Sequence, residues 1–407
     1  FLRSAINMVK CAIGAGSFSV PYAFVQEGLW MGIAGTLVMG VLSAYTIILL
    51  ARSEKYVVRQ SNTHRRFTYP EVARNLFPGM VLGGTNVLEA IVYTGMVLAS
   101  IGVCAIYAVF ILGNLPQVAD TNWRYIAIGL GVVMLLLALI RTYSWLAITS
   151  VIGDVAVTSG IVAAIAYGLR HHTPSLDGLN DIHIGGVPQA SSTIAFLFLV
   201  HAVVLPMAQS LDGDLSEPAK FDRVVWRSTF FITSINLFFG IICATVFGLS
   251  TKGNIMANLG TSIVIKVVQV FLCVDLLFTV PMVLAFGREI VEKSIFRRAS
   301  MRQMSKRKKL LVSSLIRTLL VCVVMAIAGG VMTSKAAGNA FGNLINLVGG
   351  GVNFILGFIL PPLFHLKVLK LTNRLSVPSA IAHGAIILLG AVLFVSSTYF
   401  TIREFVI

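Results

Sequence analysis

The segment GAGSFSVP, residues 14–21, lies in the middle of an apolar stretch that covers residues 4–26. Such a stretch is long enough to cross a bilayer as a helix, but its two glycines and one proline predict that the helix is interrupted there. A second such segment, HAVVLP at residues 201–206, lies within the apolar stretch 191–211. Irregular backbone at membrane depth is tolerated only where it faces protein or a water-filled cavity. The two segments therefore predict a polar site in the middle of a membrane domain.

The composition around these segments indicates a polytopic membrane protein. Of the 407 residues, 57% are hydrophobic and 12% are charged, and the mean hydropathy is +0.89. Water-soluble domains carry roughly 25% charged residues. Long apolar runs predict eleven membrane-spanning helices, near residues 4–26, 28–51, 80–113, 124–140, 143–169, 191–211, 228–250, 261–287, 310–333, 340–364 and 378–402. Soluble enzymes, nucleic-acid-binding proteins and secreted disulfide-rich scaffolds are excluded.

The net charge of +15 follows the predicted topology. If the N-terminus is cytoplasmic, the cytoplasmic loops contain 22 lysines and arginines and the opposite loops contain 5. Such residues accumulate in the cytoplasmic loops of membrane proteins. The distribution predicts a cytoplasmic N-terminus, and the basic balance requires no nucleic-acid partner. The first residue is Phe1 instead of a methionine, so we expect a soluble N-terminal tail before it.

Cysteines and glycosylation signals bear on the compartment. All five cysteines lie within predicted spans, so no disulfide framework is expected. The chain has no Asn-x-Ser/Thr sequon, and the predicted non-cytoplasmic loops are short. These features favour the membrane of an organelle such as a vacuole or lysosome, with the plasma membrane as the alternative.

The spacing of the two interruptions predicts an internal repeat. The first falls in span one and the second in span six, so each unit contains five spans. An odd number of spans inverts the second unit relative to the first, and interrupted helices at the interface of inverted repeats are typical of secondary transporters. Within a single membrane domain, 1–407, we therefore predict repeats at 1–169 and 191–366 and an additional helix at 378–402.

Five segments resemble the amino acid/auxin permease family of the APC superfamily. They are KCAIGAGSFSVPYAFVQEGLWMGI (10–33), TYPEVARNLFPG (68–79), HAVVLPM with EPAKF (201–221), CVDLLFTVPM (273–282) and FILPPLFHLK (358–367). The resemblance implies an all-α, LeuT-like fold of eleven transmembrane helices, with a 5+5 inverted repeat and broken helices 1 and 6. It also implies secondary active transport of amino acids or related small zwitterions.

The predicted substrate site is centred on the first interruption. An unwound backbone there would offer amide N–H groups to a carboxylate at the start of a half-helix, where the helix dipole is positive. In the second interruption, His201 is a candidate for hydrogen bonding or pH-dependent binding, with a structural buried histidine as the alternative. The predicted substrate-binding residues are Gly14, Ala15, Gly16, Ser17, Tyr93, His201 and Val203.

Two predicted spans carry aspartates at mid-membrane depth. Asp275 and Thr279 lie four residues apart, on one face of span eight. The resemblance implies that this threonine completes a cation site with first-helix carbonyls, for which Ile13 is the candidate. An ionised aspartate at this depth is costly, so Asp275 is a candidate proton carrier. Asp154, beside Thr158, is its rival.

Two stripes of polar residues recur at helical spacing. Asn86, Glu89 and Tyr93 share one face of span three, and a second stripe lies on span ten at Asn343, Asn346 and Asn353. Such stripes line a permeation path or form hydrogen bonds between helices. The sequence leaves both interpretations open.

We predict a secondary active amino acid transporter, proton-coupled and working by alternating access. Sodium coupling and a non-transporting amino acid sensor are the alternatives, and an ion channel is a more distant one. No metal-ligand spacing, catalytic triad, P-loop or dinucleotide motif occurs in the sequence. We therefore expect no enzymatic activity, metal or cofactor, and the expected partners are a small amino acid and the lipid bilayer. The sequence does not indicate an oligomeric state.

Overall fold

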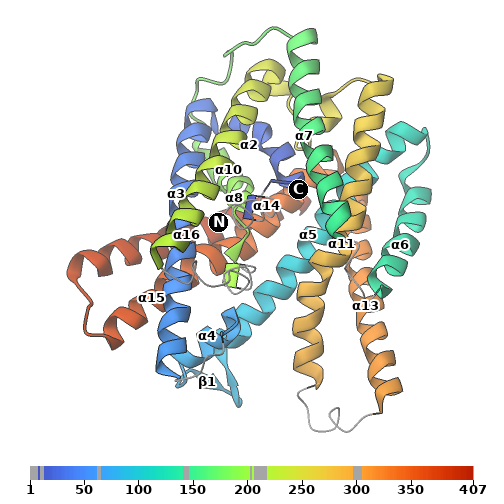
Figure 1. The fold of residues 1–407 in the computed structure, drawn as a ribbon. Helices are drawn as coiled ribbons and strands as arrows, with labels where there is room; N and C mark the ends of the chain where they lie inside the picture. Colours follow the sequence, from blue (N-terminus) through green and yellow to red (C-terminus); the bar gives the residue numbers. More distant parts are fainter. Residues whose placement is uncertain are drawn as a thin grey trace.

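The computed structural model describes residues 8–9, 13–61, 66–140, 146–201, 204–205, 218–296 and 305–406. Within these ranges the chain is almost entirely helical, and the only sheet pairs two strands of two residues each, β1 (Val81–Leu82) and β2 (Thr85–Asn86). Long helices cross the molecule in alternating directions and pack into one bundle (Figure 1).

The helices fall into two groups along the chain. The first group is η1 (Ala15–Ser19), α2 (Val20–Glu27), α3 (Leu29–Gln60), α4 (Tyr69–Leu76), α5 (Val87–Ala119), α6 (Trp123–Leu139) and α7 (Leu146–His171). The second group is η2 (Ile184–Gly186), α8 (Val187–Leu197), α10 (Pro218–Phe247), η4 (Gly248–Ser250), η5 (Ile255–Asn258), α11 (Ile263–Phe296), α13 (Lys306–Thr333), η6 (Lys335–Asn339), α14 (Ala340–Val348), the π-helix η7 (Gly349–Ile359), α15 (Leu360–Leu371) and α16 (Val377–Val406).

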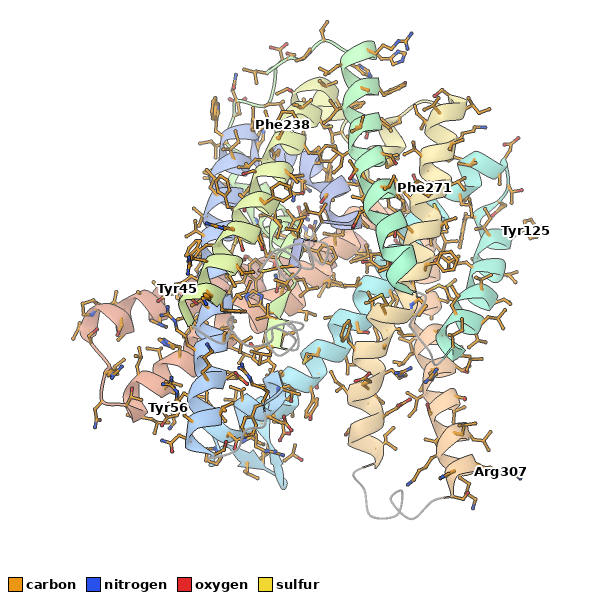
Figure 2. The ribbon with its side chains drawn as sticks, viewed as in Figure 1. Tyr45, Tyr56, Tyr125, Phe238, Phe271 and Arg307 are labelled. Atoms are coloured by element: carbon orange, nitrogen blue, oxygen red, sulfur yellow. The ribbon has the colours of Figure 1, made fainter. Side chains whose placement is uncertain are left out.

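Seven helical segments among the described residues are long and apolar enough to cross a membrane. Their outer surfaces carry large apolar side chains: Tyr125 on α6 is 75% exposed and Leu315 on α13 is 69% exposed. Tyr125 points away from the bundle (Figure 2). Apolar surface of this extent indicates contact with lipid. The all-helical membrane architecture is confirmed, whereas the count of eleven spans stays a prediction.

The basic loops lie at one end of the bundle. α4, the turn between α15 and α16, and the ends of α11 and α13 that face each other across residues 297–304 all lie at the lower end in Figure 1. Arg307 marks the same end (Figure 2). The connections that follow α5, α7 and α10 lie at the opposite end. This alternation agrees with the loop pattern that the charges predict.

Both predicted interruptions are present. In the first span, Gly14 is extended (φ −166°, ψ −150°), the 3₁₀-helix η1 follows, and the α-helix begins only at Val20. In the sixth span, α8 ends at Leu197, and a turn follows in which the Val200 N–H donates to the Phe198 carbonyl at 2.7 Å. The first interruption falls at the predicted segment. In the sixth span the described turn lies at 198–200, just before the predicted segment 201–206, of which residues 202, 203 and 206 lie outside the described residues.

Two predicted span boundaries are wrong. Residues 80–86, assigned to span three, form the β1–β2 hairpin, and α5 begins at Val87. The reason is the pair Gly83 and Gly84, whose φ values of +57° and +79° make a tight hairpin turn. Asn86 then caps α5, because its side chain accepts a hydrogen bond from the Glu89 N–H at 3.0 Å. Span six also begins earlier than predicted, at Val187.

The inner end of α6 is held by a distant arginine. Arg317 of α13 is 5% exposed. Its Nη1 donates to the carbonyls of Ala138, Leu139 and Ile140 at 2.9, 3.2 and 3.2 Å. The last carbonyls of a helix have no partner within the helix. The positive charge of Arg317 also interacts favourably with the negative, C-terminal end of the α6 dipole.

Candidate functional site

The two interrupted helices lie against each other. A methyl group placed on Gly16 would lie 2.7 Å from Cδ1 of Phe196 and 3.6 Å from Cδ2 of Leu197, both on α8. Only glycine allows this approach without a shift of the phenylalanine ring. Next to Gly14, by contrast, no described residue lies within 4 Å of such a methyl group. Among the described residues, the first interruption is therefore packed on the side of Gly16 and not on the side of Gly14.

Buried hydroxyl groups line this break. Ser17 and Ser19 are 0% exposed, and neither hydroxyl has a hydrogen-bond partner within the described residues. The Ser17 N–H donates to the Gly14 carbonyl at 3.1 Å. Buried polar groups are almost always paired, so hydroxyls left over at a helix break are available to a polar ligand. Ala15, 2% exposed, precedes both serines at the start of η1.

Ile13 precedes the break in the first span, and His201 follows the turn at the end of α8. The Ile13 N–H donates to the Val9 carbonyl at 2.8 Å, which is a helical hydrogen bond. His201 is fully buried, and its Nε2 is 2.9 Å from Oγ1 of Thr46 on α3. Nδ1 of His201 lies 3.0 Å from a methyl group placed on Gly357 of η7, and the ring also interacts with the backbone of Phe198. Val203 lies outside the described residues.

Asparagines of α14 and η7 form hydrogen bonds with α8. Oγ1 of Thr193 donates to Oδ1 of Asn346 at 2.5 Å, and Nδ2 of Asn353 donates to the Ala195 carbonyl at 2.5 Å. Oδ1 of Asn343 is buried without a partner. For Asn346 and Asn353, the interpretation as interhelical hydrogen bonds is therefore confirmed.

The Leu356 carbonyl of the π-helix η7 has no helical partner. In a π-helix each N–H bonds the carbonyl five residues earlier, so the Leu356 carbonyl would need the N–H of residue 361. That residue is Pro361, which has none. The N–H of Leu360, the α-helical alternative, bonds the Ile355 carbonyl instead.

Tyr69 supplies the missing donor. Its hydroxyl donates to the Leu356 carbonyl at 2.6 Å, and the side chain is 1% exposed. The ring packs edge-on against Phe364, with centroids 5.8 Å apart. α4 presents Tyr69 rigidly because Thr68 and Glu71 form a capping box at its start. Two segments almost 300 residues apart thus meet at one buried hydrogen bond.

We expect Tyr69→Phe to lower the stability of the folded protein by about 1–3 kcal/mol, because it leaves the Leu356 carbonyl buried without a donor. The measurement is thermal unfolding in detergent. Tyr125→Phe on the exposed face of α6 is the matched control and should unfold at the wild-type temperature. Equal unfolding temperatures for Tyr69→Phe and the wild type would contradict this role.

The structure brings the two rival aspartates together. Asp275 of α11 contacts the backbone of α7 at Gly153, where a methyl group would overlap its Oδ1. The Asp154 and Asp275 carboxyl groups interact electrostatically. Asp154 is exposed on the outer face of α7, and Asp275 is half-buried. They form one site, which we call the carboxyl pair.

Threonines flank the carboxyl pair. Oγ1 of Thr279 donates to the Asp275 carbonyl at 2.9 Å, and Oγ1 of Thr158 donates to the Asp154 carbonyl at 2.7 Å. Each hydroxyl hydrogen is therefore used within its own helix, and the oxygen lone pairs remain for a cation. The ring of Phe18 packs beside Gly160 of α7 and Leu272 of α11. Asp275 lies three residues from Leu272 along α11, and Asp154 lies six residues from Gly160 along α7. At 1.5 Å per residue, the carboxyl pair is therefore displaced by roughly 5–9 Å along these helices from the residues that contact Phe18.

Tyr93 lies apart from the first interruption. It lines a cavity of about 480 Å³ between α5 and α11, together with Glu89, Val291 and Ser294, and none of residues 13–17 lines that cavity. Glu89 also forms an ion pair with Arg74, at 3.5 Å. The cavity lies towards the end of the bundle with the basic loops. Tyr93 remains a predicted contact of the substrate.

Sequence reasoning missed several residues of this region. Ser19 lies within the first quoted segment, but its burial depends on α8. The contact of Tyr69 with Leu356 depends on the π-helix. The only available signal was that both belong to regions that resemble the same family, TYPEVARNLFPG and the chain around FILPPLFHLK.

Comparison with known proteins gives concordant results. The profile of the family described as "Transmembrane amino acid transporter protein" matches residues 1–403. Amino acid transporter AVT3C of Arabidopsis thaliana is 26% identical over 99% of this chain and 90% of its own length. Amino acid transporter ANT1 of the same plant is 25% identical over 98% of this chain and 92% of its own.

More distant similarities extend the comparison. The proton-coupled amino acid transporter-like protein pathetic of Drosophila melanogaster is 24% identical over 89% of this chain and 76% of its own. The crystal structure of a manganese transporter from Eremococcus coleocola aligns with a TM-score of 0.50 at 13% identity, covering 98% of this chain and 94% of that one. This likeness concerns the fold alone. The relatives are transporters and not enzymes, and the chain belongs to the transmembrane amino acid transporter family.

Proposed function

We propose that this protein is a secondary active, proton-coupled transporter of amino acids that works by alternating access. The observation that carries the proposal is the contact between the interrupted first span and α8, with the buried, unpartnered hydroxyls of Ser17 and Ser19 beside it. Helices broken at mid-membrane and packed on each other are typical of transporters whose substrate binds between inverted repeats. The names of the relatives support amino acids as the cargo.

The architecture we propose is a LeuT-like inverted repeat. Residues 1–169 and 191–366 form the two units, and residues 378–402 are the additional helix. The end of the bundle with the basic loops faces the cytoplasm, because such loops are retained there. The protein resides in an organelle membrane or the plasma membrane. One relative is named as a vacuolar transporter, from Saccharomyces cerevisiae, which supports the organelle.

The backbone at residues 14–17 is the proposed contact for the substrate carboxylate. The first amide groups of a helix have no partner within it, and η1 begins at Ala15. Ser17 offers a hydroxyl at the same place. His201 and Val203 complete the proposed site from the sixth span, and Tyr93 lies on the route from the cavity at the end with the basic loops.

The carboxyl pair is the proposed coupling site. Two carboxyl groups that interact electrostatically favour a shared proton over two negative charges, and an aspartate inside a membrane marks an ion pathway by default. Sodium bound by Thr279 and the Ile13 carbonyl is the second candidate. It is favoured by the free lone pairs of the Thr279 hydroxyl.

The test is uptake of labelled amino acids into proteoliposomes with an imposed pH gradient, with and without sodium. The proposal requires acid-driven accumulation that does not depend on sodium. Accumulation with sodium alone would replace the proton as the coupling ion. Binding without accumulation would support the sensor alternative instead.

We expect Asp275→Asn to abolish acid-stimulated accumulation, because the amide cannot take up a proton. Asp120→Asn is the matched control. Asp120 is exposed in a left-handed conformation that asparagine also adopts readily. The measurement is the ratio of initial uptake rates at about pH 5 and pH 8. An unchanged ratio in Asp275→Asn would contradict this role.

A further inference from the structure

Glu27 is a buried carboxyl group whose Oε1 has no partner among the described residues. It is the last residue of α2 and is 1% exposed. Its Oε1 is shielded from solvent and makes no hydrogen bond, and no described cation lies within ion-pair distance of it. A methyl group placed on Gly35 of α3 would lie 3.5 Å from Oε1 of Glu27 and 3.7 Å from Cδ1 of Ile194 on α8. A polar group thus faces two apolar helices.

The chain after α7 packs closely against the backbone around Glu27. The His183 N–H donates to the Glu27 carbonyl at 3.2 Å. Gly28 (φ +90°) has no side chain that would overlap the Asp181 carbonyl. In the same way, Gly186 has none that would overlap the Gln26 carbonyl. We call the segment 181–186 the cover. It lies at the end of the bundle opposite the basic loops (Figure 1).

The cover also connects to α8. Nε2 of Gln26 donates to Oε1 of Gln189 at 3.5 Å, so α2 and α8 are bridged beside Glu27. Both helices follow or precede an interruption that belongs to the proposed substrate site. A change in the charge of Glu27 therefore acts directly on α2 and α8, the two helices beside the proposed substrate site.

The described elements that pack against α2 offer Glu27 no compensating charge. The facing part of α3, residues 29–51, and the whole of α8 contain no ionisable residue apart from Tyr45, and α10 has no charged residue in 228–247. Asp181 and His183 of the cover are exposed. Tyr22 of α2 accepts a hydrogen bond from Nδ2 of Asn339 and interacts with the exposed Glu404 of α16.

We propose that Glu27 is a proton-binding site at the non-cytoplasmic gate, neutral when the cover is closed, as here, and ionised when it is open. A buried carboxylate without a partner is costly, whereas a buried carboxylic acid is much less so. On closure the carboxylate takes up one proton from the solution on that side, and on opening it returns one. Closure and proton binding then favour each other.

This inference rests on the proposed transport function and adds a second proton site to the carboxyl pair. Acid on the non-cytoplasmic side favours the closed cover and hence release of substrate to the other side. Alkaline solution favours the open cover. The gate therefore acts in the same direction as a proton gradient from an acidic compartment to the cytoplasm.

The test is Glu27→Gln, which imitates the protonated carboxyl group in shape. We expect the ratio of uptake at about pH 5 to that at pH 8 on the non-cytoplasmic side to fall towards unity, with the alkaline rate raised. Glu404→Gln, which removes an exposed carboxylate of α16, should keep the wild-type ratio. Glu27→Asp, which keeps a titratable group, should keep a pH dependence.

A second readout separates this inference from the proposed function. Gln189 is 7% exposed beneath the cover, so a cysteine placed there reacts with a membrane-impermeant maleimide only when the cover opens. Labelling should rise with pH in Gln189→Cys and stay low in the double variant with Glu27→Gln. Equal labelling of the two at all pH values overturns the inference. If Gln189→Cys shows this pH dependence while the wild type shows no acid-stimulated uptake, only the proposed coupling fails.

Discussion

Replacing Gly349 with alanine is expected to destabilise the protein and abolish transport. A methyl group on Gly349 would overlap the backbone carbonyl of Ser192 on α8. A backbone group cannot rotate away as a side chain can, so α8 and η7 must separate. Overpacking of this kind costs about 1–3 kcal/mol. Separation would also weaken the bonds of Asn346 and Asn353 to α8.

Gly351→Ala is the matched control for this prediction. It lies two residues further along the same π-helix, and nothing lies within 4 Å of a methyl group there. The measurements are thermal unfolding in detergent and uptake into proteoliposomes. We expect the wild-type unfolding temperature and uptake from Gly351→Ala. If both variants behaved alike, the close approach of η7 to α8 would not be required.

Replacing Gly16 with valine is expected to abolish amino acid binding and transport. The valine side chain would occupy the space of the Phe196 ring, 2.7 Å from where its first carbon atom lies. The ring could move only against the packed end of α8, where Leu197 is 1% exposed. The break in the first span would then be displaced from α8, and its amide groups would no longer converge with the sixth span.

Gly330→Val, the same kind of substitution on α13, is the matched control. Gly330 is exposed, and no described residue lies within 4 Å of a methyl group there. We expect uptake within about twofold of the wild type, since open surface substitutions usually change free energies by less than 0.5 kcal/mol. Equilibrium binding of a labelled amino acid separates loss of the site from loss of movement. Saturable binding by Gly16→Val at wild-type affinity would argue against a substrate site at this break.

The interruptions could be predicted from sequence because their causes are local. Gly14, Gly16 and Pro21 alter the backbone wherever they stand in a helix. The hairpin at 80–86 was missed because its apolar residues, such as Val81 and Leu82, continue the hydrophobic run of the next helix. Hydrophobicity alone does not distinguish an exposed turn from the first turns of a span.

The composition of the site depended on packing that no local pattern encodes. Asp154 and Asp275 were predicted as alternatives, and only the contact of α7 with α11 shows that they form one pair. The π-helix arises where Pro361 follows a run of glycines, but its free carbonyl is defined by which residue donates to it, Tyr69. Likewise, Glu27 reads as a loop residue between two spans until the cover is seen to enclose it.

The arginine that closes α6 has a consequence for biosynthesis. The Ile140 carbonyl is bonded by a residue 177 positions later in the chain. At about 5–20 residues per second, a ribosome needs roughly 10–35 s to reach it. During that interval α6 has left the ribosome with its last carbonyls unmatched, and it completes its structure only when α13 follows it into the bilayer. We therefore expect the fourth predicted span to depend on the factors that bind incompletely folded helices at the site of membrane insertion.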